Sequence, residues 1–325
     1  MRKLQKFTAG NPAVTSTYAG EAASDYIAAA LLSARTLDNQ LVTIKPNVKY
    51  KEVIQKLDVN GIIQDASCDF VTSGSVAISE RVLTPKELQV NISLCKQEFL
   101  DSWEALALGY SAFDEIPRSF NDYLVSYVGG KVAEATETSI WTGDNSLNGQ
   151  FGGFETAFSA SAATGLTTEV QAARTDGDGA IVSGSITSAN VVAKLTAVYD
   201  TISAAVYGKE DLVIYGGTNV VKAYQSALSG VTNVGSFNNN LNVGEKPSNF
   251  QGIEIVLAPG MSANSIVAAQ KSNLFFGTGL LSDYNEVRVL DMANIDGSQN
   301  YRVVMRYTAA TQFGVGQDIV FYGAH

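Results

Sequence analysis

The sequence predicts an α+β fold, and three of its regions carry that prediction. Residues 250–322 alternate apolar segments with short Gly, Pro and Asn turns, which indicates a succession of strands. Residues 117–142 place apolar side chains at helical spacing between a proline and a glycine, which predicts one long helix. Residues 189–284 alternate helix-like and strand-like segments, which indicates a compact α/β unit.

Length and charge limit the possible functions. The chain has 325 residues, 46% of them hydrophobic, which suits roughly two domains with buried cores. Its formal net charge of −10 disfavours tight, sequence-independent binding to nucleic acid, because such binding needs clustered Lys and Arg. The start of the chain runs against this trend, because Arg2, Lys3 and Lys6 form a basic tip. That tip either frays in solvent or contacts an acidic neighbour or DNA.

Targeting signals are not expected. The first residues, MRKLQKFTAGNPAV, lack the apolar core of a secretory signal. The longest apolar segments, such as YIAAALL, fall below the ~18 residues that a membrane span needs. We therefore expect no membrane association.

The first 84 residues divide into an arm and a hairpin. Residues 1–40 form the arm, which is polar and turn-rich up to residue 20 and then carries an Ala-rich helix at 21–34. Residues 41–84 indicate a hairpin with many charges, and Asn60 and Gly61 are placed as its two-residue turn. An isolated two-stranded ribbon is marginal in water, and a polar one has little core of its own. We expect this hairpin to lie on another subunit.

A strand and two helices follow Pro85. The strand has an apolar and a polar face, formed by Leu88, Val90, Ile92 and Leu94 and by Gln89, Asn91 and Ser93. An amphipathic helix is then indicated by Phe99, Trp103 and Leu106. The long helix at 117–142 comes next and ends before Gly143. Its apolar line consists of Phe120, Leu124, Val128 and Val132.

Gly129 and Gly130 stand in the middle of the long helix, where every other local signal favours continuity. Two glycines there cost roughly 2 kcal/mol relative to two alanines. Gly pairs are among the few identifiable causes of helix bends, and Gly also permits close approach of another backbone. The pair is therefore either a hinge or a site of close packing.

The middle and the end of the chain complete the expected fold. Residues 144–188 are rich in Gly, Ser, Ala and Thr, which predicts a long loop that is partly a ribbon. Residues 189–284 then give a helix, the buried strand DLVIY, a second helix and a further strand. The strands after Asn285 are expected to return to the sheet begun at Leu88, so that residues 85–188 and 285–325 form one discontinuous domain.

Catalytic and metal-binding patterns are weak. The only histidine is the terminal His325, so a Ser-His-Asp or Cys-His device would need a chain end as its base. Cys68 and Cys95 form neither a zinc pattern nor a disulfide framework, which favours buried thiols. The DGDG segment at 176–179 hints at a calcium loop, but Thr187 stands where a bidentate Glu is needed.

Two further acidic or glycine-rich segments have simpler explanations than chemistry. Asp114 and Glu115 are adjacent before Pro117, where negative charge suits a helix start. Gly216 and Gly217 lie between a strand-like and a helix-like segment, superficially a phosphate cradle, but their spacing fits no nucleotide motif. A strand-to-helix turn explains them better. We expect no enzyme activity, cofactor or metal.

The order of these parts resembles the major capsid proteins of tailed double-stranded DNA bacteriophages of the Hong Kong 97 type. The resemblance rests first on the charged hairpin, the long helix after a proline and a connector containing QFGGFE. It rests also on the α/β insert, a late strand with Arg302 and Arg306, and the C-terminal segment FGVGQDIVFYG. It implies an N-arm at 1–40, an E-loop at 41–84, a peripheral domain at 85–188 and 285–325 with a spine helix at 117–142, and an axial domain at 189–284. Asn60 and Gly61 would then mark the tip of the E-loop, and Gly129 and Gly130 a hinge in the spine helix.

A protein of this type would be a structural subunit that self-assembles into hexamers and pentamers of an icosahedral head shell. The shell would assemble in the host bacterial cytoplasm, enclose double-stranded DNA without sequence-specific binding and become the capsid of the virion. Portal, scaffold and decoration proteins would be partners. We see no scaffolding extension before residue 20 and no residues for crosslinking, so the scaffold is expected to be a separate protein.

Two other functions stay open on the sequence alone. An encapsulin-like nanocompartment shell has the same type of fold but holds cargo enzymes. A monomeric α/β ligand-binding protein or enzyme would use Gly216 and Gly217 for an anionic ligand.

Overall fold

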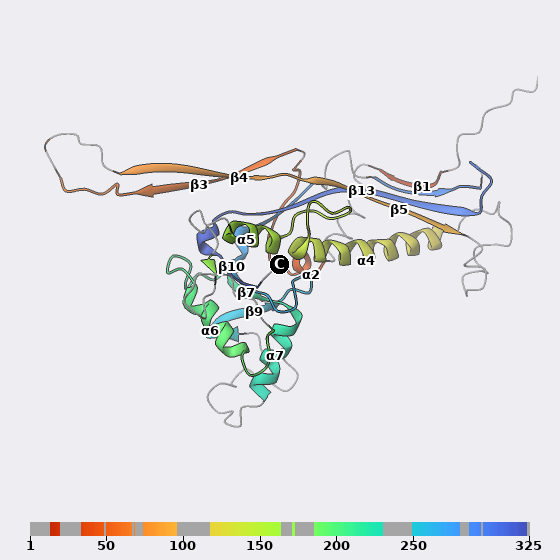
Figure 1. Cartoon of the computed structure of the whole chain (residues 1–325). Coiled ribbons are helices and arrows are strands. Elements are labelled where there is room, and N and C mark those ends of the chain that lie inside the picture. Colours follow the sequence, from red (N-terminus) through yellow and green to blue (C-terminus); the bar gives the residue numbers. More distant parts are fainter. Residues whose placement is uncertain are drawn as a thin grey trace, which may run out of the picture. The chain divides into compact units, whose positions relative to one another are not determined.

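The computed structural model describes residues 14–19, 34–48, 50–66, 68, 74–95, 118–163, 171–172, 185–229, 249–279, 286–293 and 295–323. The chain forms two compact units that are interleaved in sequence (Figure 1). Unit 1 comprises Met1–Ser33, Glu87–Ala133 and Gly279–Thr308, and unit 2 comprises Ala34–Lys86, Glu134–Thr278 and Ala309–His325. Helix α4 (Arg118–Thr142) and strand β13 (Asn300–Phe313) each belong partly to both units.

The described residues contain both helices and strands, as the sequence predicts. The strands are β1 (Val14–Ala19), β2 (Thr43–Lys45), β3 (Glu52–Asn60), β4 (Ser75–Leu83), β5 (Lys86–Cys95), β6 (Gln171–Ala172), β7 (Leu212–Gly216), β8 (Asn249–Phe250), β9 (Ile253–Leu257), β10 (Ile266–Gln270), β11 (Leu274–Thr278), β12 (Glu286–Asp291), β13 (Asn300–Phe313) and β14 (Val320–Tyr322). The helices are α2 (Arg35–Asp38), α4 (Arg118–Thr142), α5 (Phe154–Ala163), α6 (Val191–Thr201) and α7 (Thr218–Ser229), with single 3₁₀ turns η2 (Lys271–Asn273) and η3 (Gly316–Asp318).

The strands form three sheets. One has the order β1-β12-β13-β11-β2, with β5 also paired to β13. The second has the order β6-β14-β10-β7-β9-β8, and the third is the two-stranded ribbon β3-β4. The prediction that late strands return to the sheet begun at Leu88 is confirmed for β13. It is wrong for β14, which pairs with β10 in the second sheet.

The long strands of unit 1 follow the two-residue alternation that their sequences predict. In β5, Leu88 is buried and Gln89 is exposed, and the polar positions beyond it stay exposed. In β13, Tyr301 and Val303 are buried, whereas Arg302 and Arg306 are exposed. The strand predicted after Pro85 is therefore confirmed, and so is the late strand that carries the two arginines.

Helix α4 has the predicted limits. It runs for 25 residues between Pro117 and Gly143. Val128 and Val132 of its predicted apolar line are buried. The helix ends at a glycine because of a close approach: a Cβ at Gly143 would lie 2.2 Å from the carbonyl oxygen of Phe151.

The second sheet gives unit 2 its α/β core. Strands β7 and β10 are buried along their whole length, and β7 is parallel to β9. Helices α6 and α7 pack beside this sheet and contact each other (Figure 1). The predicted alternation of helix, strand, helix and strand across residues 189–257 is confirmed.

A buried carboxylate joins the start of unit 2 to the end of α4. Glu137 accepts hydrogen bonds from the backbone N–H of Thr36, at 2.8 Å, and from its hydroxyl, at 2.7 Å. The same hydroxyl accepts a bond from the indole nitrogen of Trp141 at 2.8 Å. The Trp141 ring lies 5.1 Å from that of Tyr215, whose hydroxyl donates to the carbonyl of Leu41. Burial raises the pKa of Tyr215, so this donor stays protonated.

The structure corrects the expectation of a long loop after α4. Residues 154–163 form helix α5, which the small, polar composition of residues 144–188 conceals. Phe154 and Phe158 on this helix are fully buried, and Glu155 accepts bonds from the backbone and hydroxyl of Ser262 at 2.9 Å and 2.6 Å. Two aromatic anchors and one buried carboxylate therefore hold a helix whose other side chains are small.

Several expectations for the N-terminal half fall partly or wholly outside the described residues. Residues 14–19 form a strand, so the turn-rich interpretation of residues 1–20 is wrong for them. The expected helix at 21–34 and the amphipathic helix with Phe99, Trp103 and Leu106 lie outside the described residues, except for Ala34.

Candidate assembly surfaces

The ribbon β3-β4 of unit 2 carries five of the large hydrophobic side chains that are exposed among the residues that the structure describes. Its strands pair antiparallel from Glu52 opposite Leu83 to Asn60 opposite Ser75, and they run side by side in Figure 1. Because residues directly opposite each other share a face, the register determines which side chains gather on each side of the ribbon.

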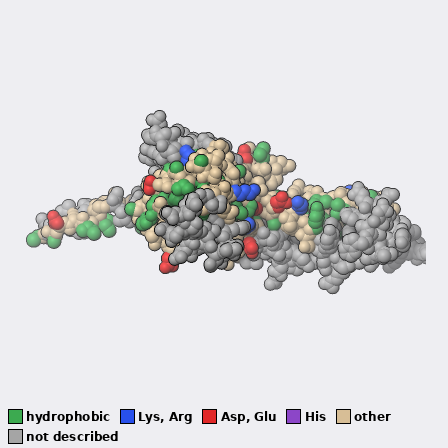
Figure 2. Space-filling view, turned by 90° about the horizontal axis from the view of Figure 1, so that it is seen from below, with side chains coloured by type: hydrophobic (Ala, Val, Ile, Leu, Met, Phe, Trp, Pro, Cys, Tyr) green, Lys and Arg blue, Asp and Glu red, His purple; other side chains and the backbone are tan. Residues whose placement is uncertain are grey.

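One face of the ribbon is apolar and exposed to solvent. It carries the pair Val53 and Val82, exposed by 48% and 42%, and the pair Leu57 and Ile78, exposed by 62% and 64%. Val76, exposed by 63%, extends this apolar face toward the tip. Figure 2 shows hydrophobic side chains along this element at the far left of the view. The pair Gln55 and Glu80, joined by a hydrogen bond of 2.8 Å, lies between the two apolar pairs. Exposed apolar side chains gathered on one face in this way are typical of an interaction site.

The other face of the ribbon carries charged side chains beside the apolar Ile54 and Leu83. Glu52, Lys56 and Arg81 occupy register positions that alternate with the apolar ones. The expectation of a polar hairpin is therefore wrong for one of its two faces. The sequence signal for that face is weak, because Ile54 and Ala77 interrupt the alternation in VIQKLDV and SVAISERV, and Gln55 and Glu80 fall on the same face as the exposed apolar residues.

The tip of the hairpin differs from the predicted one. Asn60 ends β3 and Gly61 opens a connection that continues to residue 74, so the two-residue turn at Asn60-Gly61 is wrong. Gly61 has φ +65°, a left-handed conformation that suits glycine. Ile62 and Ile63, which follow it, are exposed by 60% and 91%. The connection thus adds apolar side chains beyond the ribbon itself.

Both cysteines differ from the expected buried thiols. Cys68 lies in this connection and is exposed, and Cys95 at the end of β5 is half-buried. Neither forms a disulfide.

Gly129 and Gly130 both lie within α4, as predicted. Gly129 is buried and Gly130 is exposed. A Cβ at Gly130 would meet nothing within 4 Å, so internal close packing does not explain that glycine. The hinge interpretation of the pair stays a prediction.

The glycines proposed as a phosphate cradle form a strand-to-helix turn, as expected. Gly216 ends β7 and α7 begins at Thr218. The N–H of Gly217 donates to the carbonyl of Ser265 at 3.0 Å, and that of Asn219 donates to Ala263 at 3.1 Å. A Cβ at Gly217 would lie 2.1 Å from the carbonyl oxygen of Ser262. Protein carbonyls thus occupy the donors that an anionic ligand would need.

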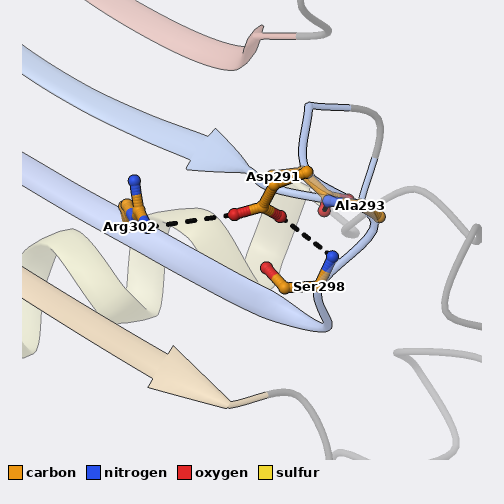
Figure 3. A network of polar contacts seen from close by, with 5 residues as sticks. Asp291, Ala293, Ser298 and Arg302 are labelled. Atoms are coloured by element: carbon orange, nitrogen blue, oxygen red, sulfur yellow. Dashed lines mark hydrogen bonds and ion pairs between the residues drawn. The ribbon is translucent and has the colours of Figure 1, made fainter.

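The turn between β12 and β13 is held by two aspartates. Asp291 accepts a bond from the N–H of Ala293, and Asp296 accepts one from the N–H of Ser298, both at 2.9 Å. Asp296 also lies 3.9 Å from the guanidinium of Arg302 on the following strand. Figure 3 labels Asp291, Ala293, Ser298 and Arg302 around this turn. These contacts stiffen a turn at the end of the strand pair.

Two findings concern metal binding and membrane insertion. Among the described residues, no group of three or more His, Cys, Asp or Glu side chains is placed to hold a metal ion. Within the same ranges, every helix is too short or too polar to span a membrane. The basic tip, Asp114 and Glu115, the segment 176–179 and His325 lie outside the described residues.

Comparison with solved structures identifies the fold. The chain aligns over 100% of its length, and over 95% of the other chain, with the "Capsid of native GTA particle computed with C5 symmetry", at TM-score 0.56 and 15% identity. It aligns over 92% of its length, and 98% of the other chain, with the "Satellite phage P4 procapsid including size determination (Sid) protein", at TM-score 0.53 and 11% identity. The chain has the fold of a tailed-phage major capsid protein.

A third similar structure, "Gordonia phage Cozz", covers 89% of this chain at TM-score 0.55 and 11% identity, with 86% of that chain aligned. Neither a protein-family model nor a curated protein matches the sequence. At identities of 11% to 15%, these comparisons show a likeness of fold alone. The exposed apolar face of β3-β4 is the candidate functional surface that this fold presents.

Proposed function

We propose that this chain is the major capsid protein of a tailed bacteriophage, a structural subunit that self-assembles into the icosahedral shell around double-stranded DNA. The capsid fold supports this proposal because the solved capsids align over nearly the whole chain. The observation that carries it is the exposed apolar face of the ribbon β3-β4. A subunit that stayed monomeric would leave that face in water at a free-energy cost of about 25 cal/mol for each Å².

The parts of the Hong Kong 97-type subunit are assigned as follows within this proposal. The ribbon β3-β4 is the E-loop, with Asn60 and Gly61 at the base of its tip, and α4 is the spine helix. The sheet containing β7, β9 and β10, with α6 and α7, is the axial domain, and residues 1–40 are the N-arm. The compact units group residues 134–188 and 309–325 with this axial part, so the exact limits of the peripheral domain stay a prediction.

The proposed assembly consists of hexamers and pentamers in which the E-loop of one subunit lies over the peripheral domain of the next. Contacts of this heterologous kind close into rings, and rings of two sizes give a shell its curvature. Portal, scaffold and decoration proteins are proposed partners. Assembly takes place in the host cytoplasm, and the product is the virion shell. The net charge of −10 suits a container that does not adhere to its DNA.

Electron microscopy of the purified protein tests this function. We expect rings or closed shells, with a scaffold or other viral partner supplied where needed. As a control, a chain in which residues 53–80 are replaced by a short Gly-Ser turn should fold and stay unassembled, because the loop-closure cost of the change is small. A parent protein that remains a monodisperse monomer across salt, pH and concentration would contradict the proposal. Shells that capture an enzyme in place of DNA would favour a nanocompartment.

A further inference from the structure

An apolar plug fixes the root of the ribbon to the body of unit 2. Val48 precedes the ribbon along the chain and Leu83 is its last residue. Both are buried together with Ala310 of β13, and Ile54 packs against them. Gly277 of β11 lies directly under Leu83, since a Cβ at that glycine would be 2.5 Å from the Leu83 Cδ2 atom. Residues farther along the ribbon, such as Leu57 and Ile78, are exposed to solvent instead. The ribbon is therefore attached at its root.

Arg81 clamps the second strand of the ribbon at this root. Its guanidinium carbon lies 3.9 Å from the centroid of the Phe313 ring, within the range of a cation–π interaction. Its Nε donates to the carbonyl of Gly314 at 3.1 Å. The amide of Gln312 donates to the carbonyl of the next ribbon residue, Val82, at 3.1 Å. Three consecutive residues at the end of β13 thus hold two consecutive residues of β4.

The backbone of Gly314, whose carbonyl accepts the hydrogen bond from Arg81, is itself held in place. The N–H of Gly314 donates to the carbonyl of Asn273 at 3.0 Å, and the side-chain oxygen of Asn273 accepts from Val315 at 2.7 Å. Burial also lowers the pKa of Arg81, although a guanidinium stays charged at any physiological pH. A half-buried charge is costly unless ring and hydrogen-bond contacts compensate it. The environment of Arg81 provides both.

A second cation holds the first leg of the hairpin. Lys45 of β2 lies with its Nζ 5.1 Å from the centroid of the Phe275 ring, and it forms an ion pair with Glu52, the first residue of β3. Phe275 and Phe313 belong to the paired strands β11 and β13. Each leg of the hairpin is thus attached to one strand of the same pair by a cation and an aromatic ring.

We propose that Arg81 is a positioning residue that sets the direction in which the ribbon leaves β11 and β13, and hence the angle at which its apolar face meets a second copy of this chain. This inference rests on the proposed shell function. The geometry favours positioning over general stability for one reason. The clamp acts on β4 only at its root, where a small change in angle is magnified along nine paired residues.

Distance measurements between spin labels on the unassembled full chain test the clamp. Labels are placed at Leu57→Cys on the ribbon and Val192→Cys on α6, both exposed, with Cys68 and Cys95 replaced by serine. We expect a narrow distance distribution in the parent and one at least twofold broader in Arg81→Ala. Lys56→Ala, which removes a cation farther out on the same ribbon, is the control and should leave the width unchanged.

The width of the distance distribution distinguishes a loss of the Arg81 clamp from misfolding of the variant and from failure of the proposed shell function. Equal widths in Arg81→Ala and the parent, with both chains folded, would overturn the clamp. If Arg81→Ala does not fold, Arg81→Lys decides, because it keeps the charge over Phe313 but lacks the Nε donor. Its distribution should broaden, and an unchanged one would overturn the proposal. Failure of the parent to form shells would count against the capsid function alone, because the distances are measured before assembly.

Discussion

At the scale of single residues, two glycines show why the same residue type has opposite consequences. Gly130 lies on the exposed side of α4 with no atom near its missing Cβ, whereas Gly217 lies against the carbonyl oxygen of Ser262. The first glycine costs helix stability without any internal packing to justify it. The second permits a contact that no other residue can make.

Gly130→Ala should therefore raise the free energy of unfolding by about 1 kcal/mol, because alanine has the higher helix propensity and meets open space. Gly217→Ala should lower it by about 2 kcal/mol, the usual range for an overpacked site. Denaturant titration of both variants checks the two signs. A loss of stability in Gly130→Ala would mean that the helix needs a bend there.

A double substitution in α4 tests the hinge interpretation. If Gly129 and Gly130 let the spine helix bend, replacing both with alanine should stiffen it and shift the balance between compact and expanded particles. Particle diameters and expansion kinetics equal to those of the parent would exclude a hinge. Misfolding of the isolated double variant would instead point to packing at the buried Gly129.

Asp211 gives the chain a stability that depends on pH. Burial alone would raise its pKa, but hydrogen bonds from Ser272 and Gln270 outweigh that effect and leave the pKa below its usual value. The folded state therefore favours the carboxylate. The resulting stabilisation is complete above the ordinary pKa of about 3.9 and is lost as the pH falls through the lower folded pKa.

Asp211→Asn should lower the melting temperature by about 2 °C at pH 7, since one charge-assisted network is weakened. The difference from the parent should shrink below about pH 4 and vanish in stronger acid. Calorimetry at a series of pH values measures it. A gap that stays constant down to pH 2 would assign the loss to packing and not to charge.

At the scale of elements, the predictable ones are those whose signals are local. Pro117 and Gly143 enclose α4, and the alternation around Leu88 defines β5, because backbone constraints and two-residue periodicity act within a few residues. Helix α5 escaped prediction because its stability comes from the burial of Phe154 and from Ser262, which is distant in sequence. The clamp at Arg81 was missed for the same reason, since its partners lie more than 200 residues away.

The ribbon β3-β4 allows a direct test at this scale. Replacing Leu57 and Ile78, which are opposite each other on the exposed apolar face, with lysine should reduce assembly at least tenfold. The reason is that two charges would be buried without partners in a subunit contact. Folding should be unaffected, because both side chains are more than half exposed in the single chain.

Light scattering and sedimentation measure this loss of assembly. Leu147→Lys, which also places a charge at an exposed leucine but outside the ribbon, is the matched control. Normal assembly of the Leu57→Lys, Ile78→Lys double variant would show that this face does not meet another subunit.

At the scale of the whole molecule, the order of parts was a better guide than any motif. No pair of catalytic residues, no metal ligands and no nucleotide fingerprint could be assigned from the sequence, and sequence identity to the solved capsids is 15% or less. The capsid fold is nevertheless common to these chains. The exact division into domains could not be predicted, because α4 and β13 each contribute residues to both compact units.

The ribbon also has a consequence before any shell exists. Two nine-residue strands with open edges and a water-exposed apolar face are the features that promote uncontrolled aggregation. The pair of Gln55 and Glu80 places a carboxylate between the apolar side chains of that face, and a charge in this position opposes the stacking of like ribbons. Under the proposed shell function, a newly made chain would be either captured by other copies or lost to irreversible aggregation. Slow synthesis and a ready supply of growing shells would favour capture.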